Sequence, residues 1–93
     1  MKIEMIPVRS SNLKEIGYDH KNELLIIIFH KGDAYRYTNV PYDTYTQLMK
    51  GDPDNNSIGK YFCAHIRTNP QYRYSKLREK SFKDHDGKKF YVE

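Results

Sequence analysis

The longest apolar run of the sequence, Leu24–Phe29, constrains the fold more than any other feature. Its isoleucines and its phenylalanine are typical of a β-strand, and six residues are too few to cross a lipid bilayer. Side chains alternate across a strand, so the run divides into two apolar sets that point to opposite faces of a sheet. One set consists of Leu25, Ile27 and Phe29, and the other consists of Leu24, Ile26 and Ile28. Both faces of the sheet therefore need cover.

Two further strands are expected on either side of this run. Residues 15–19 (EIGYD) and 34–38 (AYRYT) carry β-branched and aromatic side chains, and polar turn-forming residues separate them from the central run. Gly32 stands where a tight hairpin needs a positive φ angle. Consecutive strands with short connections predict a three-stranded antiparallel meander.

Two helices are expected after the third strand. The first has Pro41 in its first turn and Gly51 at its end, which are common end signals of helices. The second begins near Ser57, a good N-cap residue, and ends before Asn69-Pro70. Each helix has an apolar stripe, so both should pack on one face of the sheet in an α+β fold. The stripes consist of Tyr42, Tyr45, Leu48 and Met49 in the first helix and of Ile58, Tyr61, Phe62, His65 and Ile66 in the second.

This order of segments resembles the KTSC domain, a module named for its place at the C-terminus of some lysyl-tRNA synthetases and also found as a single-domain protein. The segments that carry the resemblance are VRSSNLKEIGYD, the apolar strand that ends at Phe29, AYRY, VPYDTYTQL and SIGKYFCAHIR. They cover residues 8–74. The family commonly has Asn-Arg where this chain has Cys63-Ala64, so a polar contact is missing. Because of the synthetase context, the resemblance suggests RNA binding, and it implies no established activity.

A single domain, residues 1–93, is expected from the length, with a KTSC-like core over residues 8–74 and a C-terminal extension over residues 75–93. The extension contains Phe82, an Asp86-Gly87 turn signal and the strand-like residues 90–92. We predict that this extension, or a second copy of the chain in a homodimer, covers the outer sheet face that carries Ile26 and Ile28. Large exposed apolar patches are uncommon on monomers.

Positive charge is concentrated in the last third of the chain. Residues 1–59 carry seven Lys and Arg against eight Asp and Glu, whereas residues 60–93 carry nine against four. This basic segment favours an anionic partner. Cys63 is the only cysteine, and the N-terminal segment MKIEMIPVRSSN is too polar for a signal peptide, so we expect a cytoplasmic protein without a membrane partner. A host protein and a phage-encoded protein would show the same pattern.

No enzyme, metal site or cofactor is expected. Asp52, Asp54 and Asn56 match the first ligands of a calcium loop, but serine and cysteine replace its glycine and its final glutamate. Cys63 and His65 stand two residues apart on a helix, which points them to opposite sides, so they cannot form a nucleophile and base pair.

A candidate polar site consists of Ser10, Ser11, Asn12 and His65. The serines and the asparagine could present hydroxyl and amide groups to a ligand, or they could form a local turn before the first strand. For His65, a place at the edge of the core is favoured over a functional role.

The tripeptide Tyr-Arg-Tyr (YRY) occurs at residues 35–37 and again at residues 72–74. In the first copy, alternation places Tyr35 and Tyr37 on one sheet face, where they could stack on bases or pack under the helices. Packing is favoured because the helices need a sheet face. The second copy lies in a basic segment without an apolar period, which is either a binding surface or an ordinary solvated segment.

Nucleic-acid binding through the basic C-terminal surface, with RNA as the favoured ligand, is the leading hypothesis. The residues expected to contact the nucleic acid are Lys60, Arg67, Tyr72, Arg73, Tyr74, Lys76 and Arg78. The alternative is a protein-interaction or inhibitory module that uses the apolar outer face of the sheet.

Overall fold

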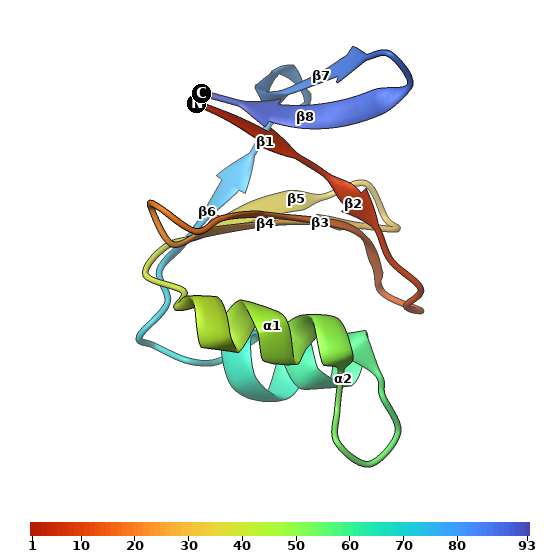
Figure 1. Ribbon diagram of the computed structural model, residues 1–93, viewed down its shortest axis with the longest axis vertical. Coiled ribbons are helices and arrows are strands. Elements are labelled where there is room, and N and C mark those ends of the chain that lie inside the picture. The colour runs from red at the N-terminus through yellow and green to blue at the C-terminus, as the bar shows by residue number, and fades with distance from the viewer.

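The main β-sheet lies between a pair of helices and a smaller sheet (Figure 1). The computed structural model describes residues 1–93. The main sheet is antiparallel with the strand order β2-β3-β4-β5-β6, and the smaller sheet has the order β1-β8-β7. The strands are β1 (Lys2–Glu4), β2 (Ile6–Pro7), β3 (Leu13–Asp19), β4 (Leu24–Phe29), β5 (Ala34–Tyr37), β6 (Tyr74–Leu77), β7 (Phe82–His85) and β8 (Lys88–Val92). The fold class is α+β, as predicted.

The predicted meander is present as β3, β4 and β5, but it is only part of the main sheet. β2 pairs with β3 at one edge and β6 pairs with β5 at the other, so the prediction of a three-stranded sheet is wrong. Neither added strand has an apolar face that would reveal it in the sequence. β2 has two residues and ends in proline, and every residue of β6 except Leu77 is exposed. Short or charged edge strands of this kind discourage pairing with other chains.

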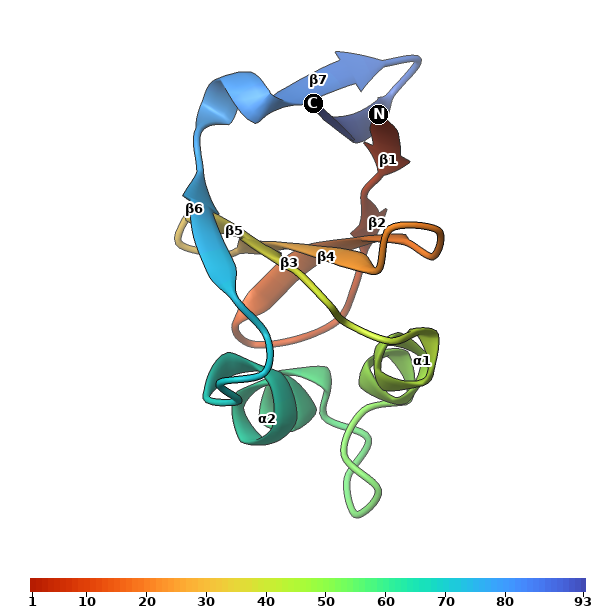
Figure 2. The same cartoon turned by 90° about the vertical axis from the view of Figure 1, so that its left-hand side faces the viewer.

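The two helices lie on one face of the main sheet, as predicted (Figure 2). The helix α1 (Tyr42–Lys50) follows Pro41 and ends at Gly51, whose φ angle is 86°. The helix α2 (Ile58–Phe62) begins after Ser57, whose hydroxyl accepts a hydrogen bond from the backbone N–H of Lys60 at 3.1 Å. A π-helical turn, η1 (Cys63–Arg67), continues α2. None of the helices combines the length and the apolar character that a membrane crossing requires.

An apolar core fills the space between the helices and the inner face of the main sheet. Its buried residues are Leu13, Ile16, Leu25, Ile27, Tyr37, Val40, Leu48, Phe62, Ile66 and Tyr72. Phe62 is fully buried, as predicted, with its ring centroid 5.5 Å from that of Tyr37. His65 is exposed instead of belonging to the packed stripe, and its ring lies 4.4 Å from that of Tyr61. The wider spacing of the π-helical turn rotates His65 away from the sheet.

The outer face of the main sheet is covered by both ends of the chain. The second apolar core joins the two sheets and consists of Ile3, Met5, Ile26, Ile28, Ala34 and Tyr91. In the extension, a short 3₁₀ turn, η2 (Glu79–Ser81), leads into β7 and β8, which are joined at Asp86 and Gly87 with positive φ angles. The predicted cover by the extension is confirmed. β1, which pairs Ile3 with Tyr91, is a part of the cover that the sequence does not reveal.

Two contacts fix the chain ends to this outer face. Gly17 in β3 allows the N-terminal segment to pass closely, since a Cβ atom there would lie 2.6 Å from the sulfur of Met5. Arg36 of β5 points to the outer side, donates a hydrogen bond to the hydroxyl of Tyr91 and forms an ion pair with Glu93. The two termini accordingly lie side by side (Figure 1).

Candidate functional site

The two YRY copies meet on neighbouring strands. In the pairing of β5 with β6, Tyr37 stands opposite Tyr74 and Tyr35 stands opposite Lys76. All four side chains therefore share the inner face of the sheet, and Arg36 lies on the outer face, as alternation predicts. The ring of Tyr74 lies 5.9 Å from that of Tyr35 and 6.0 Å from that of Tyr37, measured between centroids. An aromatic cluster at the edge of the sheet is the result.

The tyrosines of the two copies differ sharply in exposure. Tyr37 is 4% exposed and packs in the inner core, whereas Tyr74 is 64% exposed. Tyr35 is half-buried between the ring of Phe29 and that of Tyr74. Tyr72 was expected to contact nucleic acid, but its side chain is buried in the core, with its hydroxyl 3.3 Å from that of Thr44, which argues against such a contact. Each copy thus contributes one core tyrosine and one accessible tyrosine.

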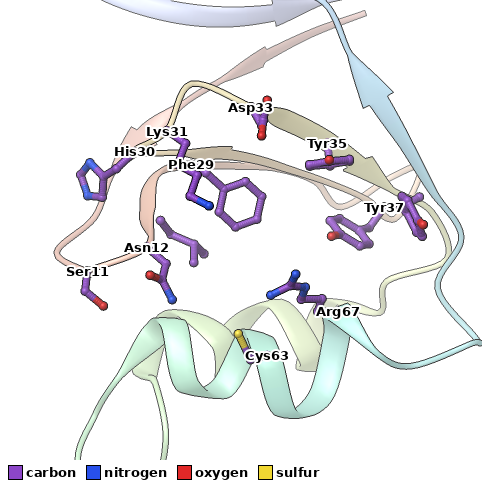
Figure 3. Close-up of a pocket in the computed structure, with 12 residues that line it drawn as sticks. Ser11, Asn12, Phe29, His30, Lys31, Asp33, Tyr35, Tyr37, Cys63 and Arg67 are labelled. Carbon is purple, nitrogen blue, oxygen red and sulfur yellow. The ribbon is translucent and has the colours of Figure 1, made fainter.

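A cavity of about 440 Å³, which we call the Arg67 hollow, opens beside this cluster (Figure 3). The β4–β5 hairpin, the loop before β3, the π-helical turn and the start of β6 surround it. Its lining residues are Ser11, Asn12, Leu13, Phe29, His30, Lys31, Asp33, Tyr35, Tyr37, Cys63, Arg67 and Tyr74. The hollow therefore draws on four of the five sequence segments that carry the KTSC resemblance.

The close packing of α2 on the loop before β3 determines the far side of the hollow. A Cβ atom on Gly59 would lie 3.0 Å from the hydroxyl oxygen of Ser10. That hydroxyl accepts hydrogen bonds from the backbone N–H groups of Asn12 and Leu13, at 3.3 and 3.2 Å, so Ser10 forms the local turn that was one of the two alternatives. Ser11 and Asn12 remain exposed and line the hollow.

The π-helical turn supplies Cys63 and Arg67 to the hollow, while His65 lies outside its lining. The predicted separation of Cys63 from His65 is therefore confirmed. Single π-helical turns inside helices are frequent at functional sites. His65 does not join Ser11 and Asn12, so the candidate polar site predicted from the sequence is only partly assembled.

Arg67 is the most distinctive charged group of the hollow. Its guanidinium forms no ion pair and no hydrogen bond within the chain, although Asp33 lines the same hollow. The carboxylate of Asp33 lies 3.7 Å from the ammonium group of Lys76 instead. Burial raises the pKa of Tyr37 to about 12 despite the charge of Arg67, which acts in the opposite direction. Tyr37 is therefore a neutral hydroxyl at physiological pH.

The remaining cations predicted from the sequence fall into two groups. Arg73 lies next to the aromatic cluster and lines a second depression of about 450 Å³ together with Arg67 and Tyr74. Lys76 lies on β6 beside Tyr35. Lys60 is exposed on α2, and Arg78 lies near Phe82 on the side of the smaller sheet. Arg67, Arg73 and Lys76 therefore lie near the aromatic cluster, whereas the contribution of Lys60 and Arg78 to the same surface stays a prediction.

Several lining residues were missed by sequence reasoning. Lys31 and Asp33 belong to the segment HKGD, which indicates only a hairpin turn, and Phe29 belongs to the apolar strand. Their contribution depends on the position of the helix across the sheet, which no local pattern reports. No group of three His, Cys, Asp or Glu side chains is placed to hold a metal ion.

Comparison with known proteins supports the resemblance. The model of the KTSC domain family matches residues 9–72. An uncharacterized protein of Stutzerimonas stutzeri (strain A1501) is 32% identical over 76 residues, which are 81% of this chain and 99% of that protein. The crystal structure of a KTSC domain protein from Yersinia pestis superposes with a TM-score of 0.68 at 30% identity, over 82% of this chain and 99% of that chain. Neither description mentions a lysyl-tRNA synthetase. This chain belongs to the KTSC domain family.

Proposed function

We propose that the chain binds single-stranded RNA across a surface formed by Tyr35, Arg67, Arg73, Tyr74 and Lys76, here called the YRY surface. The observation that carries the proposal is the pairing of β5 with β6, which sets the 64% exposed ring of Tyr74 beside Tyr35 and Lys76. Aromatic rings interleaved with Lys and Arg are a recurrent platform for unpaired nucleotides, because every base has a face to stack and every linkage has a charge.

Single-stranded RNA fits this surface better than a duplex. The bases of an unpaired strand can turn their faces toward a ring such as that of Tyr74, whereas a duplex hides those faces in its stack. The surplus of positive charge in residues 60–93 supplies attraction to phosphates without selecting a sequence. A cytoplasmic location would agree with this proposal.

The alternative function requires an exposed apolar outer face on which a protein partner can dock, and the smaller sheet covers that face. Ile26 and Ile28 lie under the smaller sheet and are 0% and 7% exposed. A partner would first have to displace β1, β7 and β8. A homodimer through this face was expected only as a cover for Ile26 and Ile28, and both are already buried within the chain.

Fluorescence anisotropy with labelled single-stranded and duplex RNA tests the proposal. We expect binding to the single strand that weakens steeply between about 50 and 200 mM salt. Replacing Tyr74 with alanine should weaken it by about 1 to 3 kcal/mol, the typical loss of one stacked base, without lowering the melting temperature. Tyr42→Ala is the matched control, because Tyr42 is 46% exposed on α1, away from this surface.

Two results would contradict the proposal. One is the absence of binding to any single strand at low salt. The other is equal RNA affinity of Tyr74→Ala and Tyr42→Ala.

A further inference from the structure

The Arg67 hollow combines three kinds of side chain within one cavity. Phe29, Tyr35 and Tyr37 form an aromatic wall, with the Phe29 and Tyr35 rings 5.9 Å apart between centroids and nearly perpendicular. Ser11 and Asn12 place a hydroxyl and an amide at one end, and Lys31 and Arg67 contribute positive charge (Figure 3). The combination of an aromatic wall, neutral polar groups and cations restricts the chemistry of a ligand.

The charge of Arg67 is available to a ligand. A guanidinium carries five N–H donors in a fixed plane, and none of them has an acceptor within this chain. The one carboxylate in the lining, that of Asp33, is paired with Lys76. Figure 3 shows Arg67 rising from the helix into the space below Tyr37. Such a guanidinium is suited to two parallel hydrogen bonds with a phosphate group.

The size of the hollow sets an upper limit on the ligand. About 440 Å³ lies within the range of small-molecule sites, and it suits one nucleotide rather than several. A terminal phosphate monoester carries more negative charge than an internal phosphodiester, and it can enter a cavity that a continuous strand must pass by. The aromatic wall beside the cations provides a place for the attached base.

We propose that the Arg67 hollow binds a nucleoside monophosphate group, with Arg67 and Lys31 at the phosphate and Phe29 and Tyr35 against the base. This group can come from the phosphorylated end of an RNA strand or from a free nucleotide. The strand-end form rests on the proposed RNA binding, since the YRY surface adjoins the hollow through Tyr35, Arg67 and Tyr74. The hollow would then select strands by their ends, while the YRY surface holds the rest of the strand.

The test compares three short RNAs of one sequence, with a 5′-phosphate, a 3′-phosphate or no terminal phosphate, by anisotropy on the wild-type chain. Calorimetry with uridine monophosphate, uridine and inorganic phosphate provides the free-nucleotide arm. We expect one phosphorylated end to bind about tenfold or more tightly than the strand without it, as charge-assisted hydrogen bonds permit. Uridine monophosphate should bind better than uridine or phosphate alone.

Variants assign the effect to the hollow. Arg67→Gln should remove the preference for a terminal phosphate, and Arg67→Lys should restore part of it, since the charge remains without the planar fork. Lys60→Gln is the matched control, because Lys60 lies exposed on α2 and lines no part of the hollow. Lys60→Gln should keep the full preference for a terminal phosphate. Lys31→Gln is a second variant in the hollow and should also weaken the preference.

The outcomes separate this inference from the proposed function. If Tyr74→Ala weakens all three RNAs but terminal phosphates make no difference and uridine monophosphate does not bind, the proposed function stands and the inference is overturned. If no RNA binds while uridine monophosphate binds in an Arg67-dependent manner, the inference stands with a free nucleotide as ligand and the proposed function fails. A terminal-phosphate preference that Arg67→Gln leaves intact would also overturn the inference.

Discussion

The two faces of the main sheet are covered in different ways. On the outer face, which we call the closed face, Ile26 and Ile28 pack against Ile3, Met5 and Tyr91 from both ends of the chain, and these side chains are buried. On the inner face, the helices cover the centre of the sheet but leave the β5–β6 edge beside the Arg67 hollow. The closed face consists mainly of aliphatic side chains, whereas the open edge consists of tyrosines and cations. Side chains with a polar tip are those that tolerate partial cover, and they are also the ones that can bind a ligand.

Removal of the extension should have the largest effect on stability, because it uncovers the outer face of the main sheet. Truncation after Lys80 deletes the buried Tyr91 and leaves β1 without its partner strand. We expect a loss of more than about 5 kcal/mol in the free energy of unfolding, which is comparable to the whole stability of a small domain. The truncated chain should unfold or self-associate, as measured by circular dichroism and size-exclusion chromatography. A stable, soluble monomer would show that the smaller sheet is not the required cover.

Loss of Phe62 would test the covered centre of the inner face. The side chain is fully buried against Tyr37 and Phe29. Phe62→Ala should therefore lower the free energy of unfolding by about 3 to 5 kcal/mol. Denaturant titration measures this loss, and Tyr42→Ala, at an exposed position, serves as the control. A loss below about 1 kcal/mol would contradict the packing described for α2.

Alkaline pH should destabilise the chain through the tyrosines of the inner face. Burial raises the pKa of Tyr37 and of Tyr18 to about 12, from 10.0. The folded chain therefore holds these protons more tightly, so the stabilisation is complete below pH 10 and is lost as the pH rises toward 12. Between pH 8 and 11 Tyr37 should cost about 1.4 kcal/mol of stability, and the less buried Tyr18 should cost less. Denaturant titrations at both pH values measure the loss, and Tyr37→Phe should reduce it by about 1.4 kcal/mol. An unchanged pH dependence in this variant would contradict the burial of Tyr37.

The sequence predicted those elements whose end signals are local. Pro41, Gly51 and Ser57 mark the helix ends where the structure has them, and Asp86-Gly87 marks the last hairpin. The division of the apolar run into two buried faces also follows from alternation alone. These features depend on neighbours in the chain, which a sequence displays directly.

The features that the sequence did not reveal depend on distant segments. β1 and β6 are short and largely polar, and they are strands only because β8 and β5 lie beside them. Tyr72 and Tyr74 belong to the same tripeptide, yet one is buried and the other is exposed because the strand begins between them. The π-helical turn that exposes His65 has no signal in the residue pattern. The Arg67 hollow likewise arises from the meeting of four segments, which are the loop before β3, the β4–β5 hairpin, the π-helical turn and β6.

A nuclear magnetic resonance titration of the labelled chain with single-stranded RNA compares the two faces in one measurement. The central claim is that the ligand occupies the open edge of the inner face and leaves the closed face untouched. We predict that the resonances of Tyr35, Arg67 and Tyr74 shift on binding, while those of the smaller sheet, such as Tyr91, stay in place. Shifts confined to β7 and β8, or no shifts at low salt, would contradict the claim.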